Sequence, residues 1–364
     1  MKLKAFAAVA LGVLAVTSHA AADSSRTAVR TVKKLADGIY TIRHKDAPDT
    51  FPQGNTTVVI GEREVLVVDS CYLPSAARED IAEIRKWTDK PVRYLVNTHW
   101  HFDHTMGNGT YWQAFPGLSI IAHTETAKQI AGYNPGWFER FPKRADRMRQ
   151  ILADGKDGNG KTLSEGDRKE YEEAITGLAP VQEEFKTIVD HAPTISFGSE
   201  ISLDLGWREV RIIHLGRGNT AGDAIVFLPK EKILMTGDLV VHPVPYMFGG
   251  YPGEFGRTLT KMELLRFETI VPGHGEVLNA TASRNYVRLL AEFCEAVSDL
   301  TSSELHRTGS GAANLPAVRE GVMKKLDVAA WRRKFAGEDK TEQDAFDTSF
   351  AAMVTAAFNE VNGR

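Results

Sequence analysis

The sequence has little cysteine, no strongly basic run and only one apolar run of notable length. Its two cysteines, Cys71 and Cys294, form no CxxC motif, which excludes a redox dithiol or a cysteine-rich zinc site. They lie far apart in the sequence, so they could pair as a disulfide or stay as two buried thiols. The formal net charge of −3 and the dispersed basic residues disfavour a nucleic-acid partner.

Two common catalytic motifs are also absent. The sequence holds neither a Gly-x-Ser-x-Gly nucleophile elbow nor a phosphate-binding Gly-x-x-x-x-Gly-Lys loop. The one long apolar run, residues 5–16, follows a basic start and leads into small residues, a pattern typical of a secretory signal peptide. We therefore expect a signal peptide over residues 1–22 and a periplasmic or secreted protein without a membrane anchor.

The residues that are present point to a metal site. The segment 97–104, Asn-Thr-His-Trp-His-Phe-Asp-His, follows a predicted short strand. His99 and His101 point the same way if the alternation of that strand continues, and Asp103 and His104 follow at a turn. Imidazole nitrogens and a carboxylate suit a borderline metal such as zinc, and their spacing offers two pairs of ligands.

The His-x-His-x-Asp-His run resembles the signature of the metallo-β-lactamase superfamily of metal-dependent hydrolases. The resemblance covers roughly residues 31–276 and includes Asp238 in Thr-Gly-Asp and His274 in Pro-Gly-His-Gly. It implies an α/β fold, a four-layer αββα sandwich, with two zinc ions per chain. It also implies a set of metal ligands, which in this chain are His99, His101, Asp103, His104, Asp238 as the bridge, His274 and the residue at 219.

Position 219 departs from the family pattern, because Asn219 stands where relatives usually carry the third histidine of the first metal site. An amide oxygen is a weaker zinc donor than imidazole, so we expect weaker binding there. His214 or His242 could supply the missing ligand instead. Arg217 is better suited to a substrate carboxylate than to a metal. Asp69, at the end of an apolar strand, could orient a ligand histidine or cap the following helix.

The resemblance implies a metallo-β-lactamase-like domain over residues 23–290. Hydrophobic periodicity predicts a helical insertion in it at 134–196 and a C-terminal helical extension over 291–364. The loop 154–160 lacks the ligand offsets of a calcium site, so we interpret it as a turn. His123 is expected to be structural or to lie behind the ligands. Four aromatic residues could line one wall of the substrate cleft, namely Trp112, Trp137, Phe138 and Phe141.

The predicted strands span residues 31–35, 39–43, 55–60, 64–69, 92–96, 118–122, 201–205, 209–214, 224–228, 232–235 and 268–271. The predicted helices span residues 75–87, 125–131, 148–152, 168–188, 286–300 and 344–358. Strand, helix and strand alternate in each half, which predicts that ligands lie at the carboxyl ends of strands.

The resemblance implies an exported zinc-dependent hydrolase in which a bridging hydroxide attacks an activated carbonyl of a β-lactam, lactone or thioester. Asp103 would orient the nucleophile. Asp238, where many true β-lactamases carry Cys or Ser, favours a glyoxalase-II-like or lactonase-like branch, whereas export favours β-lactams. The alternatives are a periplasmic metal-binding accessory protein with a degenerate site and a mononuclear iron dioxygenase of the same fold. The expected partner is a small-molecule substrate, with the chain a monomer or homodimer.

Overall fold

The computed structural model describes residues 29–157, 162–247, 249–309, 311 and 314–363, and only the backbone of residues 133–142. The predicted signal peptide, residues 1–22, lies outside the described residues, as does part of the turn at 154–160. In the part of the chain that is described, no helix is long and apolar enough to cross a membrane.

The first sheet has seven strands in the order β1 to β7. The strands are β1 (Thr31–Ala36), β2 (Ile39–Arg43), β3 (Thr56–Ile60), β4 (Val65–Val68), β5 (Val92–Asn97), β6 (Ser119–His123) and β7 (Ile195–Phe197). Neighbours from β1 to β4 are antiparallel, whereas β4 to β7 run parallel. The carboxyl ends of β4, β5 and β6 therefore meet at one edge of the sheet.

The second sheet has five strands in the order β12, β11, β10, β9, β8. These are β8 (Glu200–Asp204), β9 (Glu209–Ile213), β10 (Ile225–Leu228), β11 (Ile233–Met235) and β12 (Thr269–Val271). Only β11 and β12 are parallel. Their carboxyl ends bring the loops after residues 235 and 271 together.

Alternate residues of each strand explain how the sheets pack. In β4, every residue is buried: Leu66 and Val68 face the core between the sheets, whereas Val65 and Val67 face the core under the helices. A strand covered on both faces has this continuously apolar character. From the second sheet, Val210, Ile212, Val226, Leu228, Ile233 and Met235 enter the same inner core.

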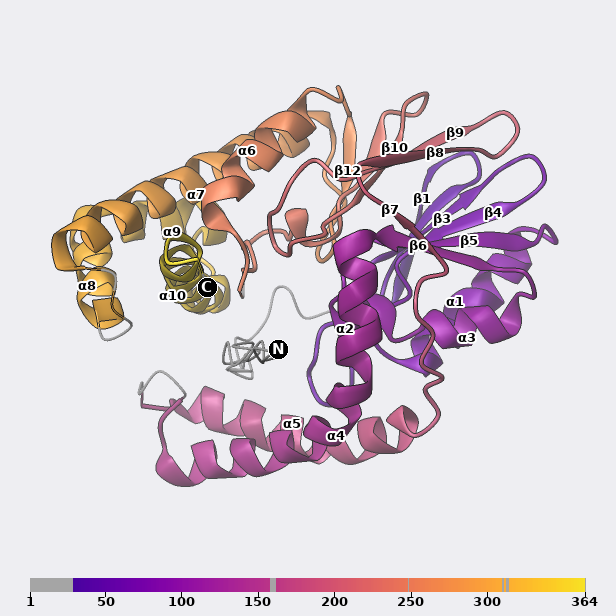
Figure 1. Cartoon of the computed structure of the whole chain (residues 1–364). Helices are drawn as coiled ribbons and strands as arrows, with labels where there is room; N and C mark the ends of the chain where they lie inside the picture. The colour runs from indigo at the N-terminus through magenta and orange to yellow at the C-terminus, as the bar shows by residue number, and fades with distance from the viewer. Residues whose placement is uncertain (1–28, 158–161, 248, 310, 312–313, 364) are drawn as a thin grey trace, which may run out of the picture.

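Helices cover the outer face of each sheet (Figure 1). The outer core of the first sheet takes residues of α1 (Pro74–Trp87) and α3 (Asn108–Ala114), which follow β4 and the short α2 (Phe102–Thr105). The outer core of the second sheet takes residues of α6 (Pro252–Glu263) and α7 (Ala280–Thr308). The four layers confirm the predicted αββα sandwich.

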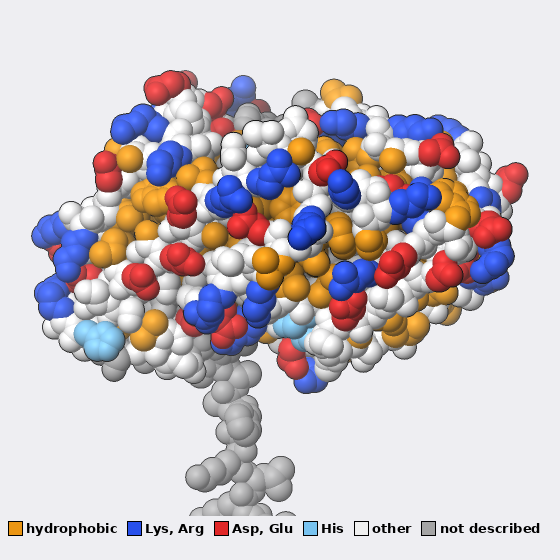
Figure 2. All heavy atoms as spheres, turned by 90° about the horizontal axis from the view of Figure 1, so that it is seen from above, with side chains coloured by type: hydrophobic (Ala, Val, Ile, Leu, Met, Phe, Trp, Pro, Cys, Tyr) orange, Lys and Arg blue, Asp and Glu red, His pale blue; other side chains and the backbone are white. Residues whose placement is uncertain are grey.

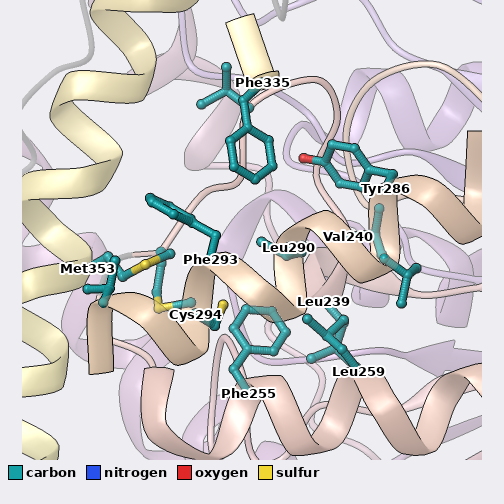
Figure 3. Close-up of a cluster of buried hydrophobic side chains, with 14 of the residues drawn as sticks. Leu239, Val240, Phe255, Leu259, Tyr286, Leu290, Phe293, Cys294, Phe335 and Met353 are labelled. Carbon is teal, nitrogen blue, oxygen red and sulfur yellow. The ribbon is translucent and has the colours of Figure 1, made fainter. Parts of the chain in front are cut away.

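The C-terminal helices continue the second of these cores. They are α8 (Leu315–Lys325), α9 (Val328–Ala336) and α10 (Lys340–Val361). Phe293 of α7 packs against the rings of Phe335, Phe346 and Phe350, as part of the buried cluster in Figure 3. The helix α7 passes through residue 290, so the boundary placed there by the sequence falls inside a helix.

Two long helices, α4 (Thr124–Asp154) and α5 (Glu165–Phe185), form the insertion and lie side by side in Figure 1. Ser164 and Asp167 form a reciprocal cap at the start of α5. A buried ion pair between Asp49 and Arg144 attaches α4 to the loop before β3. A Cβ atom built on Gly177 of α5 would overlap the carbonyl of Pro48 in that same loop.

The structure corrects several predictions. The helices expected at 125–131 and 148–152 are parts of the single helix α4, and β7, α2, α3 and α6 were not predicted. Cys71 and Cys294 are both buried free thiols in different cores, so the disulfide is wrong and the alternative of two buried thiols holds. The side chains of Trp137, Phe138 and Phe141 lie outside the described residues, and Trp112 is exposed against His191.

The surface carries charges of both signs. On the face shown in Figure 2, acidic and basic side chains are interspersed, and apolar side chains are visible between them. Neither sign of charge forms one continuous patch on that face. Electrostatic steering of a polyanion calls for a patch of that kind.

Candidate metal centre

Three segments of the chain bring six of the predicted ligands together at the carboxyl ends of β5, β11 and β12. His99 and His101 follow β5, and Asp103 and His104 lie in the short helix α2. Asp238 lies in the turn after β11. His274 follows β12, the parallel neighbour of β11.

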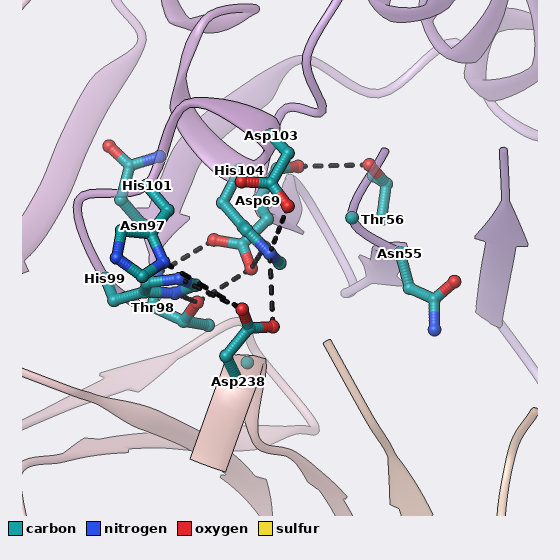
Figure 4. A network of polar contacts seen from close by, with 12 residues as sticks. Asn55, Thr56, Asp69, Asn97, Thr98, His99, His101, Asp103, His104 and Asp238 are labelled. Carbon is teal, nitrogen blue, oxygen red and sulfur yellow. Dashed lines mark hydrogen bonds and ion pairs between the residues drawn. The ribbon is translucent and has the colours of Figure 1, made fainter. Parts of the chain in front are cut away.

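These side chains form two groups that could hold a metal ion. The first group contains His99, His101 and Asp238, and the second group contains Asp103, His104, Asp238 and His274. Within each group the donor atoms lie within 4.8 Å of one another. Figure 4 shows most of these side chains converging from the two sheets.

In the second group, the donors of Asp103, His104 and His274 are close together. His274 Nε2 lies 2.8 Å from Asp103 Oδ2 and 3.2 Å from His104 Nε2. His104 Nε2 lies 3.4 Å from Asp103 Oδ2. Two imidazole nitrogens and a carboxylate oxygen therefore face one small volume.

Asn219 lies beside one histidine of the first group, His101. Its Nδ2 lies 3.5 Å from Nδ1 of His101, and its side chain is buried. His99 is fully buried, whereas the side chain of His101 is 23% exposed. The structure therefore places Asn219 next to His101, at the edge of the first group.

Asp238 joins the two groups with its two carboxylate oxygens. Oδ1 lies 3.3 Å from His104 Nε2 and 3.6 Å from His274 Nε2. Oδ2 lies 3.4 Å from His99 Nε2 and 4.0 Å from His101 Nδ1. Gly273 makes this approach possible, because a Cβ atom there would overlap Asp238 Oδ1.

Asp69 lies behind the ligands and holds two of them. Its Oδ2 accepts from Nδ1 of His104 at 2.9 Å and from the Thr98 hydroxyl at 2.8 Å. The hydroxyl of Thr98 has a single proton, which it donates to Asp69. The hydroxyl oxygen of Thr98 therefore accepts from Nδ1 of His99, 3.0 Å away. Both histidines therefore donate through Nδ1 and direct Nε2 to the centre, the orientation that a metal ligand needs.

The electrostatics of the group follow from burial and from the neighbouring charges. Burial, together with the nearby His104, lowers the pKa of His99 to about 4. Burial would also lower the pKa of His104, but Asp238, Asp103 and Asp69 raise it well above its ordinary value. Burial opposes ionisation of Asp103, yet His104 and His274 lower its pKa below the ordinary value. A cation would therefore displace protons from this site.

The residues present fit a metal-binding role. His99 Nε2 and Asp238 Oδ1 are buried and have no hydrogen-bond partner among the described residues. Unpaired buried polar atoms are costly, and two of them at the centre of a ring of imidazoles and carboxylates fit a cation as the missing partner.

Three predicted residues do not join the two groups. His214 stacks on His123 with ring centroids 4.0 Å apart and contacts the Asp223 carbonyl through Nδ1. His242 packs edge-on against Tyr286. Arg217 forms a bidentate pair with Glu254. The suggestion that His214 or His242 replaces the third histidine is therefore wrong for this conformation, and Arg217 already has a carboxylate partner.

The sequence did not predict the role of Asn55, which holds the backbone of the loop around His274. The amide of Asn55 donates to the Gly273 carbonyl at 2.7 Å, and its side chain donates to the carbonyls of Pro272 and Gly275. Asn55 thus holds the loop that carries His274. Its only sequence signal is a polar residue at the start of an apolar strand, which many strands share. His123, predicted to be structural, caps α4 by accepting from the Glu125 amide.

Comparisons with known proteins identify the family and support the fold. The family model of the metallo-beta-lactamase superfamily matches residues 49–274, so the chain belongs to that superfamily. A solved metallo-beta-lactamase from Pontibacter korlensis is 15% identical and covers 72% of this chain and 99% of its own, with a TM-score of 0.52. At this identity the likeness supports the fold alone.

Two curated relatives are similar in sequence. The linear primary-alkylsulfatase of a Pseudomonas species is 23% identical over 224 residues, which are 58% of this chain and 39% of that protein. The alkyl/aryl-sulfatase BDS1 of Saccharomyces cerevisiae is 22% identical over 226 residues, 59% of this chain and 31% of that protein. The matched region thus spans less than half the length of either relative.

Proposed function

We propose that this member of the superfamily is a hydrolase with a two-metal centre, and that zinc is the metal. The observation that carries the proposal is Asp238, whose two oxygens face two separate groups of donors. His99, His101 and Asn219 would hold one ion, and Asp103, His104 and His274 the other, with Asp238 between them. When bound, such ions polarise the scissile group and lower the pKa of water.

The residues of the chain have complementary tasks in this proposal. Asp69 and Thr98 keep His104 and His99 in the ligand tautomer. Asp103, held ionised by its histidine neighbours, can orient the attacking water by accepting a hydrogen bond from it. Burial of the donors reduces competition from bulk water.

For the substrate we propose an activated acyl compound, a β-lactam, a lactone or a thioester. A second candidate is a sulfate ester, which is favoured by the names of the two curated relatives. The two classes differ in the atom attacked but need the same donors. Membership of the fold does not choose between them, because one scaffold hosts many reactions.

A metal analysis and a substrate screen test this proposal. The purified full chain should hold two zinc ions after dialysis against dilute zinc. It should then hydrolyse at least one of nitrocefin, a thioester, a lactone, p-nitrophenyl sulfate or an alkyl sulfate. Asp103→Asn should reduce the rate by about 100-fold or more. The control is Asp37→Asn, since Asp37 is an exposed turn residue, with a side chain 93% exposed, and its rate should be unchanged.

The alternatives give different results in the same experiment. A metal-binding accessory protein would take up zinc without turning over any of the five substrates. A mononuclear iron dioxygenase would hold one iron ion and consume oxygen. Either result would overturn the hydrolase proposal.

We also propose that the protein is exported, because residues 1–22 have the pattern of a signal peptide. The mature protein from a periplasmic extract should then begin after Ala20 or Ala22, which mass spectrometry measures. We propose a monomer or homodimer, which light scattering of that sample distinguishes. An unprocessed N-terminus in the cytoplasmic fraction would contradict export.

A further inference from the structure

A second buried group of polar side chains lies close to the metal centre. His44, Cys71 and Asp80 come within 4.8 Å of one another, and all three are buried. Their contacts do not favour a metal. Burial and the nearby Asp80 raise the pKa of the Cys71 thiol well above its ordinary value, and both ring nitrogens of His44 already have partners.

The partners of His44 form a chain that ends at the backbone of Gly54. His44 Nε2 lies 2.8 Å from Oδ2 of Asp80, and the other oxygen of Asp80 accepts from Arg30 at 2.9 Å. On the other side of the ring, Nδ1 donates to the Gly54 carbonyl at 2.7 Å. His44 is 1% exposed and Asp80 is fully buried, so water does not compete for these contacts.

Gly54 in turn touches the second group of ligands. Its amide donates to the carbonyl of Asp103 at 3.0 Å. Its α-carbon packs so closely on the imidazole of His104 that a Cβ atom there would overlap the ring. Two of the proposed ligands therefore rest directly on this one glycine.

The ring of His104 is thus held from two directions. Asp69 accepts the proton of Nδ1 and fixes the direction of the ring within its plane. Gly54 lies against the ring and limits its movement out of that plane. A shift of the Gly54 backbone would release His104 and would also move Asp103.

We propose that His44 and Asp80 are positioning residues for the second metal ion, because together they hold Gly54 against His104. The inference rests on the proposed function, since it concerns the affinity of that centre for metal. It assigns a role to a histidine and an aspartate that contact no ligand side chain directly.

The test is a zinc titration of the metal-free full chain in competition with a chromophoric chelator. His101→Ala and His274→Ala each remove one ligand from one group, so they assign the two stepwise Kd values. His44→Gln and Asp80→Asn should weaken binding at the second group by about tenfold or more and leave the first within about twofold. Gly54→Ala should weaken the same group through direct overlap with His104.

Arg208→Gln is the matched control. Arg208 is a buried charged residue that pairs with Glu231 and donates to the carbonyls of Asp37 and Ile60, away from every proposed ligand. If loss of a buried polar anchor acted only through general stability, Arg208→Gln would change the zinc affinities as His44→Gln does. Thermal unfolding of the metal-free variants shows that each is folded, and Asp80→Asn replaces His44→Gln if the latter does not fold.

The outcomes separate the two proposals. If wild type binds two zinc ions and the folded His44 and Asp80 variants bind them equally well, the positioning role is overturned and the proposed function stands. Equal weakening at both groups would also overturn it. If wild type binds fewer than two zinc ions, the two-metal function fails and the inference fails with it.

Discussion

The imidazole of His104 donates its Nδ1 proton to the carboxylate of Asp69, with 2.9 Å between Nδ1 and Oδ2. The same carboxylate accepts from the amide and the hydroxyl of Thr98, and through that hydroxyl it orients His99. One buried acid therefore controls a histidine in each of the two ligand groups.

Asp69→Asn is expected to weaken zinc binding at both groups by about 10- to 100-fold. The amide keeps the size of the side chain, and asparagine tolerates the left-handed backbone at this position, where φ is +59°. The variant thus removes the charge with little change in the backbone. Zinc per chain at a buffered free-zinc concentration measures the effect. Retention of both ions at the wild-type Kd would contradict the role of Asp69.

Asn219→His is expected to raise zinc affinity at the first group by about tenfold or more, because imidazole is a better zinc donor than an amide. Asn219 is buried next to His101, so the new ring would face the same ligands. The time course of zinc loss to a chelator measures this affinity, with Asn219→Ala as the control that removes the amide. Unchanged chelator resistance in Asn219→His would show that position 219 does not ligate the metal.

Asp223 gives the folded protein a pH dependence. Burial raises the pKa of its carboxyl to about 7, against the hydrogen bonds from Thr220. Because the folded pKa lies above the unfolded value near 4, the folded chain binds this proton more tightly. The resulting stability is complete below about pH 4 and is lost as the pH rises through 7.

Asp223→Asn should remove this dependence. Its free energy of unfolding relative to wild type should rise by on the order of 2 to 4 kcal/mol between pH 4 and pH 8. Urea unfolding at the two pH values measures the change. A difference between the two proteins that is the same at both pH values would show that folding does not raise the pKa of Asp223.

Gly177→Ala is expected to destabilise the contact between the insertion and the domain. The new methyl group would overlap the carbonyl of Pro48, so α5 or the loop must move. This movement should lower the free energy of unfolding by about 1 to 3 kcal/mol. Gly132→Ala is the matched control in α4, because a Cβ atom there has no neighbour within 4 Å. That change should stabilise by about 0.5 to 1 kcal/mol. Thermal unfolding of both variants measures the difference, and equal effects would contradict the packing argument.

The candidate ligands could be named from the sequence because they have local signatures. His99 to His104 form one run, and Asp238 and His274 each follow an apolar strand beside glycine. Asn219 has no such signature of its own, and it was noticed because it stands where the family pattern has a histidine. Strands such as β4 were also predictable, since burial on both faces leaves a continuous apolar run.

The elements that were missed depend on contacts between distant residues. The strand β7 has only three residues and is defined by pairing with β6. His44 and Asp80 are 36 positions apart, and nothing in either segment alone indicates that they meet. The helix α4 was predicted as two separate helices, at 125–131 and 148–152, and in the folded chain it is one helix from Thr124 to Asp154.

The attachment of α4 and α5 has a consequence for engineering. Both helices dock on residues 47–54, through Arg144 with Asp49 and through Gly177 with Pro48, and that loop ends at Gly54 beside His104. A chimaera that exchanges the insertion alone would join foreign helices to a loop shaped for the original pair. The transplanted unit should therefore include residues 47–54, so that the grafted helices keep the loop on which they pack.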